Sequence, residues 1–172
     1  YFGRPDSVIG TETMYAVRKR SGAVLAEEAP AQADIVVPVP DSGISAAVGY
    51  AEASGIAFAE GFVKNRYVGR TFIQPEQSLR ATGVDLKLSV LADVVRGKRL
   101  VLVDDSIVRG TTILRLIRKL RAAGAAEIHL RIASPPVQYP CHFGIDMPSR
   151  GELIASSGDR VINKDGVCTI AL

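Results

Sequence analysis

The sequence predicts a doubly wound α/β fold, a mostly parallel sheet with helices on both faces. Short apolar runs of the strand type recur at residues 33–39, 100–103 and 127–133. Segments with the apolar period of a helix separate these runs, so neighbouring strands need crossover connections. The run at 100–103 is continuous rather than alternating, which is typical of a strand that is buried on both faces of a parallel sheet.

The composition is that of an ordinary globular protein. With 172 residues, 47% hydrophobic and 23% charged, we expect one core and a single domain over residues 1–172. A net charge of +3 is too small to predict nucleic-acid binding. Apolar runs stay below the roughly 18 residues that span a bilayer, and the first residues do not resemble a secretion signal. We therefore expect a cytoplasmic protein without membrane contact and, because it begins at Tyr1, a piece of a longer chain.

The first third of the chain predicts one helix and one strand after an irregular start. Residues 1–10 suggest a surface connector. Residues 11–31 favour a helix, and we expect Gly22 to interrupt its front half. The β-branched run within 33–39 then predicts a strand that Pro38 and Pro40 close.

A small polar loop, Asp41-Ser42-Gly43, follows this strand and leads into an Ala-rich helix that runs through Ala53. Such a loop can turn backbone N–H groups toward an anion, although strand-to-helix turns in many proteins use the same residues. Residues 56–62 predict a third strand.

A basic segment comes next, and we interpret residues 64–86 as one long loop. Loops of this length in compact domains are usually functional lids or disordered segments. Its charged and phenolic side chains are candidates for binding an anion, and the alternative is a solvated basic surface: Lys64, Arg66, Tyr67 and Arg70. Residues 87–95 predict a short amphipathic helix.

The central segment, residues 99–112, reads RLVLVDDSIVRGTT. Asp104 and Asp105 stand at the carboxyl end of the buried strand, where open α/β sheets bind their ligands. Adjacent carboxylates can accept hydrogen bonds from a vicinal diol such as that of ribose, or help to hold a divalent cation. The loop 106–112 and the N-terminus of the next helix suit a phosphate. GxxxxGK[ST] and GxGxxG patterns are absent, which argues against nucleotide hydrolysis and dinucleotide binding.

The last third predicts a helix from Ile113 to about Gly124 and a strand at 127–133. Within that strand we expect His129 to be a satisfied structural residue rather than a catalyst. Residues 150–155 favour a short helix, and 158–171 suggest a hairpin without chemistry. The helix after Ile113 has one apolar stripe, made by Ile113, Leu116, Ile117 and Leu120. Its other side is basic and is expected to be solvated: Arg115, Arg118, Lys119 and Arg121.

LVLVDDSIVRGTT resembles the phosphoribosylpyrophosphate-binding signature of type I phosphoribosyltransferases. Four further segments resemble the branch of that family that acts in purine synthesis: YFGRPDS at 1–7, PVPDSG at 38–43, GFVKNRYVGRTFIQP at 61–75 and FGIDMP at 143–148. The resemblance covers about residues 1–156 and implies the α/β fold of that family, with a flexible lid at 64–86 and a small hood. The tail 158–172 matches nothing that we can assign.

The resemblance also implies roles for the site residues. Asp104 and Asp105 would hold the ribose diol and position Mg²⁺, and Asp41, Ser42 and Gly43 would form the pyrophosphate loop. The family often has a second hydroxyl residue where this chain has Gly43, so we expect no side-chain metal contact there. Lys64, Arg66, Tyr67 and Arg70 would be the catalytic lid groups. The 5-phosphate would bind the loop Ser106, Ile107, Val108, Arg109, Gly110, Thr111 and Thr112.

The implied reaction is displacement at ribose C1 by ammonia with loss of pyrophosphate, which gives 5-phosphoribosylamine. Use of glutamine would need a glutaminase domain or chain, which nothing in this sequence resembles. The resemblance further implies homo-oligomers and feedback inhibition by purine nucleotides. Cys141 matches a ligand of the iron–sulfur cluster in one branch. A cubane needs four thiolates and this chain has two cysteines, so we expect no cluster here.

Two other functions remain open at this point. The chain can be a regulatory module that binds phosphoribosyl compounds or purine nucleotides without turnover, or it can be a phosphoribosyltransferase for purine bases. The presence of the lid segment KNRYVGRTF favours an enzyme, because a sensor has less need of groups that close on pyrophosphate.

Overall fold

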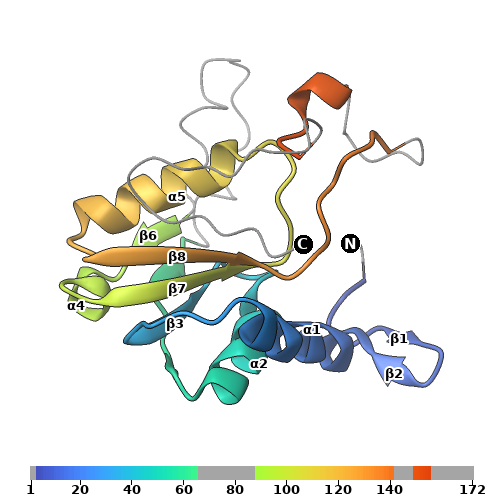
Figure 1. Cartoon of the computed structure of the whole chain (residues 1–172), viewed down its shortest axis with the longest axis horizontal. Coiled ribbons are helices and arrows are strands. Elements are labelled where there is room, and N and C mark those ends of the chain that lie inside the picture. Colours follow the sequence, from blue (N-terminus) through green and yellow to red (C-terminus); the bar gives the residue numbers. More distant parts are fainter. Residues whose placement is uncertain (1–2, 66–87, 142–148, 156–172) are drawn as a thin grey trace.

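The computed structural model describes residues 3–65, 88–141 and 149–155. Its centre is a four-stranded parallel sheet with the strand order β4-β3-β7-β8 (Figure 1). The order along the sheet differs from the order along the chain, as a doubly wound fold requires. The predicted fold class is therefore confirmed. The strands are β3 (Ile35–Pro38), β4 (Ala57–Phe58), β7 (Arg99–Asp104) and β8 (Glu127–Ile132).

Helices cover both faces of this sheet. In Figure 1, α1 (Met14–Glu28) and α2 (Ile44–Ser54) lie on one face and α5 (Thr111–Ala122) on the other. The remaining elements are short: the antiparallel pair β1 (Val8–Ile9) and β2 (Glu12–Thr13), the antiparallel pair β5 (Phe62–Lys64) and β6 (Leu88–Val90), α4 (Ala92–Val95) and the 3₁₀ turn η3 (Arg150–Glu152). Within the described ranges, no helix combines the length and the apolar content needed to cross a membrane.

The position of strand β7 in the middle of the sheet explains why its sequence is continuously apolar. Leu100 and Leu102 belong to the hydrophobic cluster under α5, whereas Val101 and Val103 belong to the cluster under α1 and α2. All four side chains are fully buried. Because side chains alternate between the two faces of a strand and both faces are covered here, every position from 100 to 103 must be apolar.

The pair of α1 and α2 depends on two glycines that bring the helix backbones together. A Cβ atom on Gly22 would lie 1.9 Å from the Ala46 carbonyl oxygen, and one on Gly49 would lie 1.8 Å from that of Lys19. The expectation that Gly22 interrupts the helix is wrong, because it lies buried inside α1. Tertiary packing offsets the roughly 1 kcal/mol that glycine costs within a helix.

The carboxyl end of α1 is tied to the sheet by a buried arginine. Arg131 of β8 donates from Nε to the Ala29 carbonyl at 2.7 Å and from an Nη to the Pro30 carbonyl at 3.0 Å. Tyr50 of α2 also donates its hydroxyl to the Ala29 carbonyl, at 3.0 Å. A cation near a helix C-terminus interacts favourably with its dipole and satisfies carbonyls that lack helical partners.

Several element boundaries differ from those expected. The strand predicted at 56–62 is two short strands, β4 and β5, in different sheets, and the first part of the helix predicted at 87–95 is strand β6. The helix expected from Ile113 begins two residues earlier, and the one expected at 150–155 is a single 3₁₀ turn. The β1–β2 hairpin was not predicted within the connector at 1–10. The hairpin expected at 158–171 lies outside the described residues.

Replacing Thr13 with alanine is expected to lower the free energy of unfolding by about 1 kcal/mol, because Thr13 is the N-cap of α1. Its Oγ1 accepts a hydrogen bond from the Ala16 backbone N–H at 3.2 Å. Thermal unfolding followed by circular dichroism should show a midpoint lower by about 2–4 °C. Thr11→Ala, outside the helix, is the control, and equal midpoints for the two variants would contradict the cap assignment.

Candidate functional site

Two loops meet at the carboxyl edge of the sheet, next to the acidic pair. Asp104 is the last residue of β7, and its Oδ1 accepts from the backbone N–H of Asp105 at 2.8 Å. The hydroxyl of Ser42, from the loop after β3, donates to the same oxygen at 3.4 Å. Ser106 donates its hydroxyl to Asp105 Oδ1 at 3.0 Å. The sheet thus brings together residues that are 62 positions apart in the sequence.

The pairing of β3 with β7 places the loop 41–43. Pro38 lies opposite Val103 in parallel register, and the Val39 N–H donates to the Val103 carbonyl at 2.8 Å. The Pro40–Asp41 peptide bond is cis. A Cβ on Gly43 would lie 2.5 Å from the Val103 carbonyl oxygen. Any side chain at position 43 would therefore push this loop away from the acidic pair.

Lys64 is brought to the same loop from another sheet. It ends β5, and its Nζ lies 2.6 Å from Asp41 Oδ2. Strand β5 is held in place because Lys64 pairs with Leu88 of β6. The Leu88 carbonyl in turn accepts a hydrogen bond from Nζ of Lys119 in α5 at 3.0 Å. The basic face of α5 is therefore not wholly solvated, because Lys119 is half-buried and tied to β6. Arg66, Tyr67 and Arg70 lie outside the described residues.

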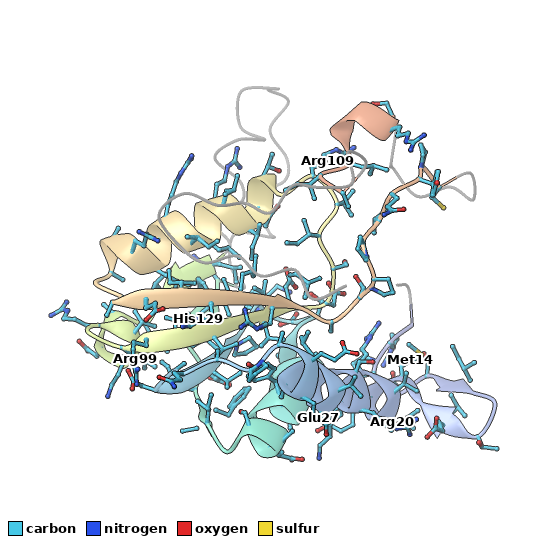
Figure 2. The ribbon with its side chains drawn as sticks, in the orientation of Figure 1. Met14, Arg20, Glu27, Arg99, Arg109 and His129 are labelled. Carbon is cyan, nitrogen blue, oxygen red and sulfur yellow. The ribbon has the colours of Figure 1, made fainter. Side chains whose placement is uncertain are left out.

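The loop 106–112 ends in the first turn of α5. Gly110 is the N-cap with φ of 77°, a left-handed conformation that favours glycine. A Cβ there would also lie 2.8 Å from Ile154 Cδ1, and the Ile154 N–H donates to the Val108 carbonyl at 2.9 Å. Thr111 and Thr112 are exposed at the N-terminus of α5, where backbone N–H groups lack helical partners. In Figure 2, Arg109 lies at this end of the molecule and Arg99 at the opposite end of β7.

A cleft of about 620 Å³ lies between these loops and is lined mainly by Ser42, Leu88 and residues 104–113. A smaller cavity of about 270 Å³ adjoins it and shares Ser42, Asp105 and Ser106. Met14, Arg18 and Ser21 of α1 line this second cavity. These three residues were not predicted from the sequence, because no local pattern marks a helix face that meets the site only through tertiary packing.

Burial changes the protonation of the acidic pair. Desolvation raises the pKa of Asp104 from its ordinary value of 3.8 to about 7, and the charge of Asp105 contributes in the same direction. The hydrogen bond from the Asp105 N–H opposes this shift. In the ligand-free protein Asp104 therefore holds a proton at a pH at which exposed carboxylates have lost theirs.

Asp104 should make the stability of the ligand-free protein depend on pH. Since its folded-state pKa is raised, its contribution is complete below about pH 4 and is lost as the pH rises through about 7. Urea unfolding between pH 5 and 8 should show this decline in wild type and a smaller one in Asp104→Asn. Asp93→Asn, on the exposed face of α4, is the control. Equal pH slopes for wild type and Asp104→Asn would contradict the raised pKa.

Comparison with known protein families identifies the family of this chain. The family model described as "Phosphoribosyl transferase domain" matches residues 12–133, more than half of the chain. The chain belongs to the phosphoribosyltransferase family. The resemblance that the sequence suggested is confirmed, and the chain is similar to several amidophosphoribosyltransferases.

The amidophosphoribosyltransferase of Synechococcus elongatus is 55% identical over 173 residues, which are 99% of this chain and 35% of the relative. That of Archaeoglobus fulgidus is 60% identical over 157 residues, 91% of this chain and 34% of the relative. A solved structure, the glutamine phosphoribosylpyrophosphate amidotransferase from B. subtilis complexed with ADP and GMP, superposes with a TM-score of 0.84 at 52% identity, over 100% of this chain and 39% of that chain. The chain thus spans about a third of the length of these curated relatives.

The acidic pair of this chain fits the Mg²⁺ that its family implies. Mg²⁺ prefers oxygen ligands and is usually bound through one or two carboxylates together with substrate oxygens and water. Asp104 and Asp105 present such a pair beside the cleft. Among the described residues, no group of three or more His, Cys, Asp or Glu side chains forms a complete metal site.

The other residues discussed from the sequence lie away from the acidic pair or outside the residues that the structure describes. His129 is partly buried in β8, and burial lowers its pKa. Its Nε2 lies 3.1 Å from Glu127 Oε1 but has no hydrogen-bond partner, so the expectation of a satisfied histidine is wrong. Cys141 is half-buried, and Cys168 lies outside the described residues. The expected lack of an iron–sulfur cluster stays a prediction.

Proposed function

We propose that this chain is the phosphoribosyltransferase domain of an amidophosphoribosyltransferase, which transfers the phosphoribosyl group of phosphoribosylpyrophosphate to ammonia. The observation that carries the proposal is the meeting of three groups at one sheet edge: the acidic pair, the loop 41–43 and the loop 106–112. The product would be 5-phosphoribosylamine, at the first step of purine synthesis. The similarity to amidophosphoribosyltransferases supports the choice of ammonia over a purine base.

The substrate would bind with its parts spread along this edge. The 5-phosphate would take the loop 106–112 and the N-terminus of α5, where N–H groups and threonine hydroxyls are donors. Asp104 and Asp105 would accept hydrogen bonds from the ribose hydroxyls and hold Mg²⁺. The pyrophosphate would take the backbone of 41–43 and the ammonium of Lys64, which lies within ion-pair distance of Asp41.

In the reaction, the bond from C1 to the pyrophosphate oxygen breaks and a bond from C1 to nitrogen forms. Pyrophosphate leaves with the electron pair, and the attacking ammonia loses a proton to water or to the released pyrophosphate. Positive charge develops on the sugar and negative charge on the leaving oxygens, so Lys64 would stabilise the leaving group. The resemblance implies that Arg66, Tyr67 and Arg70 would also stabilise the leaving pyrophosphate. Mg²⁺, when bound, would neutralise charge on the pyrophosphate. No covalent intermediate with a side chain is needed.

The relatives also suggest further partners, a source of ammonia and purine nucleotides. They are about three times as long as this chain, so we propose that a glutaminase domain or chain supplies the ammonia. Residues 1–172 would form one domain of a homo-oligomeric cytoplasmic enzyme. The B. subtilis relative was solved with ADP and GMP, which supports purine nucleotides as feedback ligands of this chain as well.

Incubating the full chain with phosphoribosylpyrophosphate, Mg²⁺ and an ammonium salt tests the proposal. We expect pyrophosphate release that depends on ammonium and stops when Mg²⁺ is chelated. Release with free purine bases but not with ammonium would indicate a base phosphoribosyltransferase. Binding of phosphoribosylpyrophosphate without release above the uncatalysed rate would indicate a regulatory module and would contradict the enzymatic proposal.

A further inference from the structure

The ion pair between Asp41 and Lys64 places a carboxylate inside the loop that is proposed to bind pyrophosphate. The two charged atoms are 2.6 Å apart, and the side chains of Lys64 and Asp41 are 50% and 67% exposed. Each residue is held by its backbone: Asp41 stands in the turn between β3 and α2, and Lys64 is paired with Leu88 in β5 and β6. The pair therefore joins two sheets at this edge of the molecule.

The carboxylate of Asp41 differs in its surroundings from those of the acidic pair. Of the described residues near it, Pro40 and Ser42 line the cleft, whereas Asp41 is not part of the lining. Ser42 donates to Asp104, while the Asp41 side chain contacts Lys64. The acidic pair can hold ribose and a cation, but the Asp41 carboxylate is engaged with a cation of the protein itself.

A loop that binds an anion gains nothing directly from a carboxylate, because like charges repel. An exposed ion pair is weak, however, and a ligand with several negative charges can displace its acidic member. We propose that Asp41 is a positioning residue which holds Lys64 in the ligand-free protein and competes with pyrophosphate for its ammonium. This inference rests on the proposed function of the cleft, and it assigns to Asp41 a role opposite to that of a ligand for the substrate.

One consequence separates this role from a general effect on the site. Breaking the ion pair costs free energy only for ligands that need the Lys64 ammonium. Pyrophosphate needs it. Ribose 5-phosphate, which occupies the acidic pair and the loop 106–112, does not. Removing the Asp41 carboxylate should therefore strengthen the binding of pyrophosphate and leave that of ribose 5-phosphate unchanged.

Titration calorimetry of the full chain with these two probes, pyrophosphate and ribose 5-phosphate in the presence of Mg²⁺, tests the proposal. In Asp41→Asn, the dissociation constant of pyrophosphate should fall about two- to fivefold, the range set by an exposed ion pair. In Lys64→Met it should rise. The double variant should match Lys64→Met, because the carboxylate acts only through the ammonium. Asp34→Asn breaks an exposed ion pair with Arg99 at the other end of β7 and is the matched control.

The outcomes distinguish the possible errors. Weaker pyrophosphate binding by Asp41→Asn would show that the carboxylate prepares Lys64 for the ligand, which overturns competition. A double variant that binds pyrophosphate more tightly than Lys64→Met would show direct repulsion by Asp41, which also overturns it. If wild type binds neither probe, the proposed function fails. If wild type binds both and Asp41→Asn behaves like wild type, only this inference fails.

Discussion

Replacing both Asp104 and Asp105 with asparagine is expected to weaken the binding of phosphoribosylpyrophosphate at least about a hundredfold. Each carboxylate would lose charge-assisted hydrogen bonds to the ribose hydroxyls and its affinity for Mg²⁺, and a single hydrogen bond to a charged group contributes about 1.5–3 kcal/mol. Asparagine keeps the shape of the side chain. Calorimetric titration with phosphoribosylpyrophosphate and Mg²⁺ measures the loss.

The control for this experiment is Asp93→Asn, which removes one exposed carboxylate from α4, outside the residues that line the cleft. Its affinity should equal that of wild type. Burial raises the pKa of Asp104 to about 7 and thus favours a neutral side chain at this position, and asparagine keeps the shape of both side chains, so the double variant should fold normally. Unchanged affinity in a folded double variant would show that the ribose and Mg²⁺ site lies elsewhere.

Replacing Gly22 with alanine is expected to lower the free energy of unfolding by about 3 kcal/mol, at the upper end of the usual cost of overpacking. The new Cβ would lie 1.9 Å from the carbonyl oxygen of Ala46, so the backbones of α1 and α2 must separate. The helix propensity of alanine recovers about 1 kcal/mol at most. Thermal unfolding should show a midpoint lower by about 6–12 °C.

Gly151→Ala is the matched control, because a Cβ at that position meets nothing within 4 Å. It should unfold at nearly the wild-type temperature. Gly49→Ala tests the same contact from the other helix, where the Cβ would lie 1.8 Å from the Lys19 carbonyl oxygen, and it should be destabilised to a similar degree. Wild-type stability of both Gly22→Ala and Gly49→Ala would show that the two helices do not pack as closely as described.

The sequence predicted the central sheet because the relevant signals are local. The apolar run before Asp104 reflects burial on both faces of β7, and that pattern is visible without any tertiary contact. The loops after β3 and β7 were visible as small polar residues between a strand and a helix. Their meeting followed from topology, since parallel neighbours end at the same edge of a sheet.

Segments with weak local signals were predicted less well. The residues that form β5 and β6 have no strong alternation, and they are strands only because they pair with each other. Gly22 looked like a helix breaker because propensity counts its own backbone and not the Ala46 carbonyl against which it packs. His129 looked satisfied because a sequence does not show whether a neighbouring carboxylate reaches hydrogen-bond geometry.

By itself, the sequence determined the fold class, the acidic pair at the end of β7 and the two loops that flank it, because each depends on residues that are close together in the chain. Only the tertiary structure decided that Asp41 pairs with Lys64, that burial holds a proton on Asp104 and that α1 lines a cavity beside Asp105. These properties arise from distances between residues that are remote in sequence, and they depend on the burial and charge that the folded chain creates around each group.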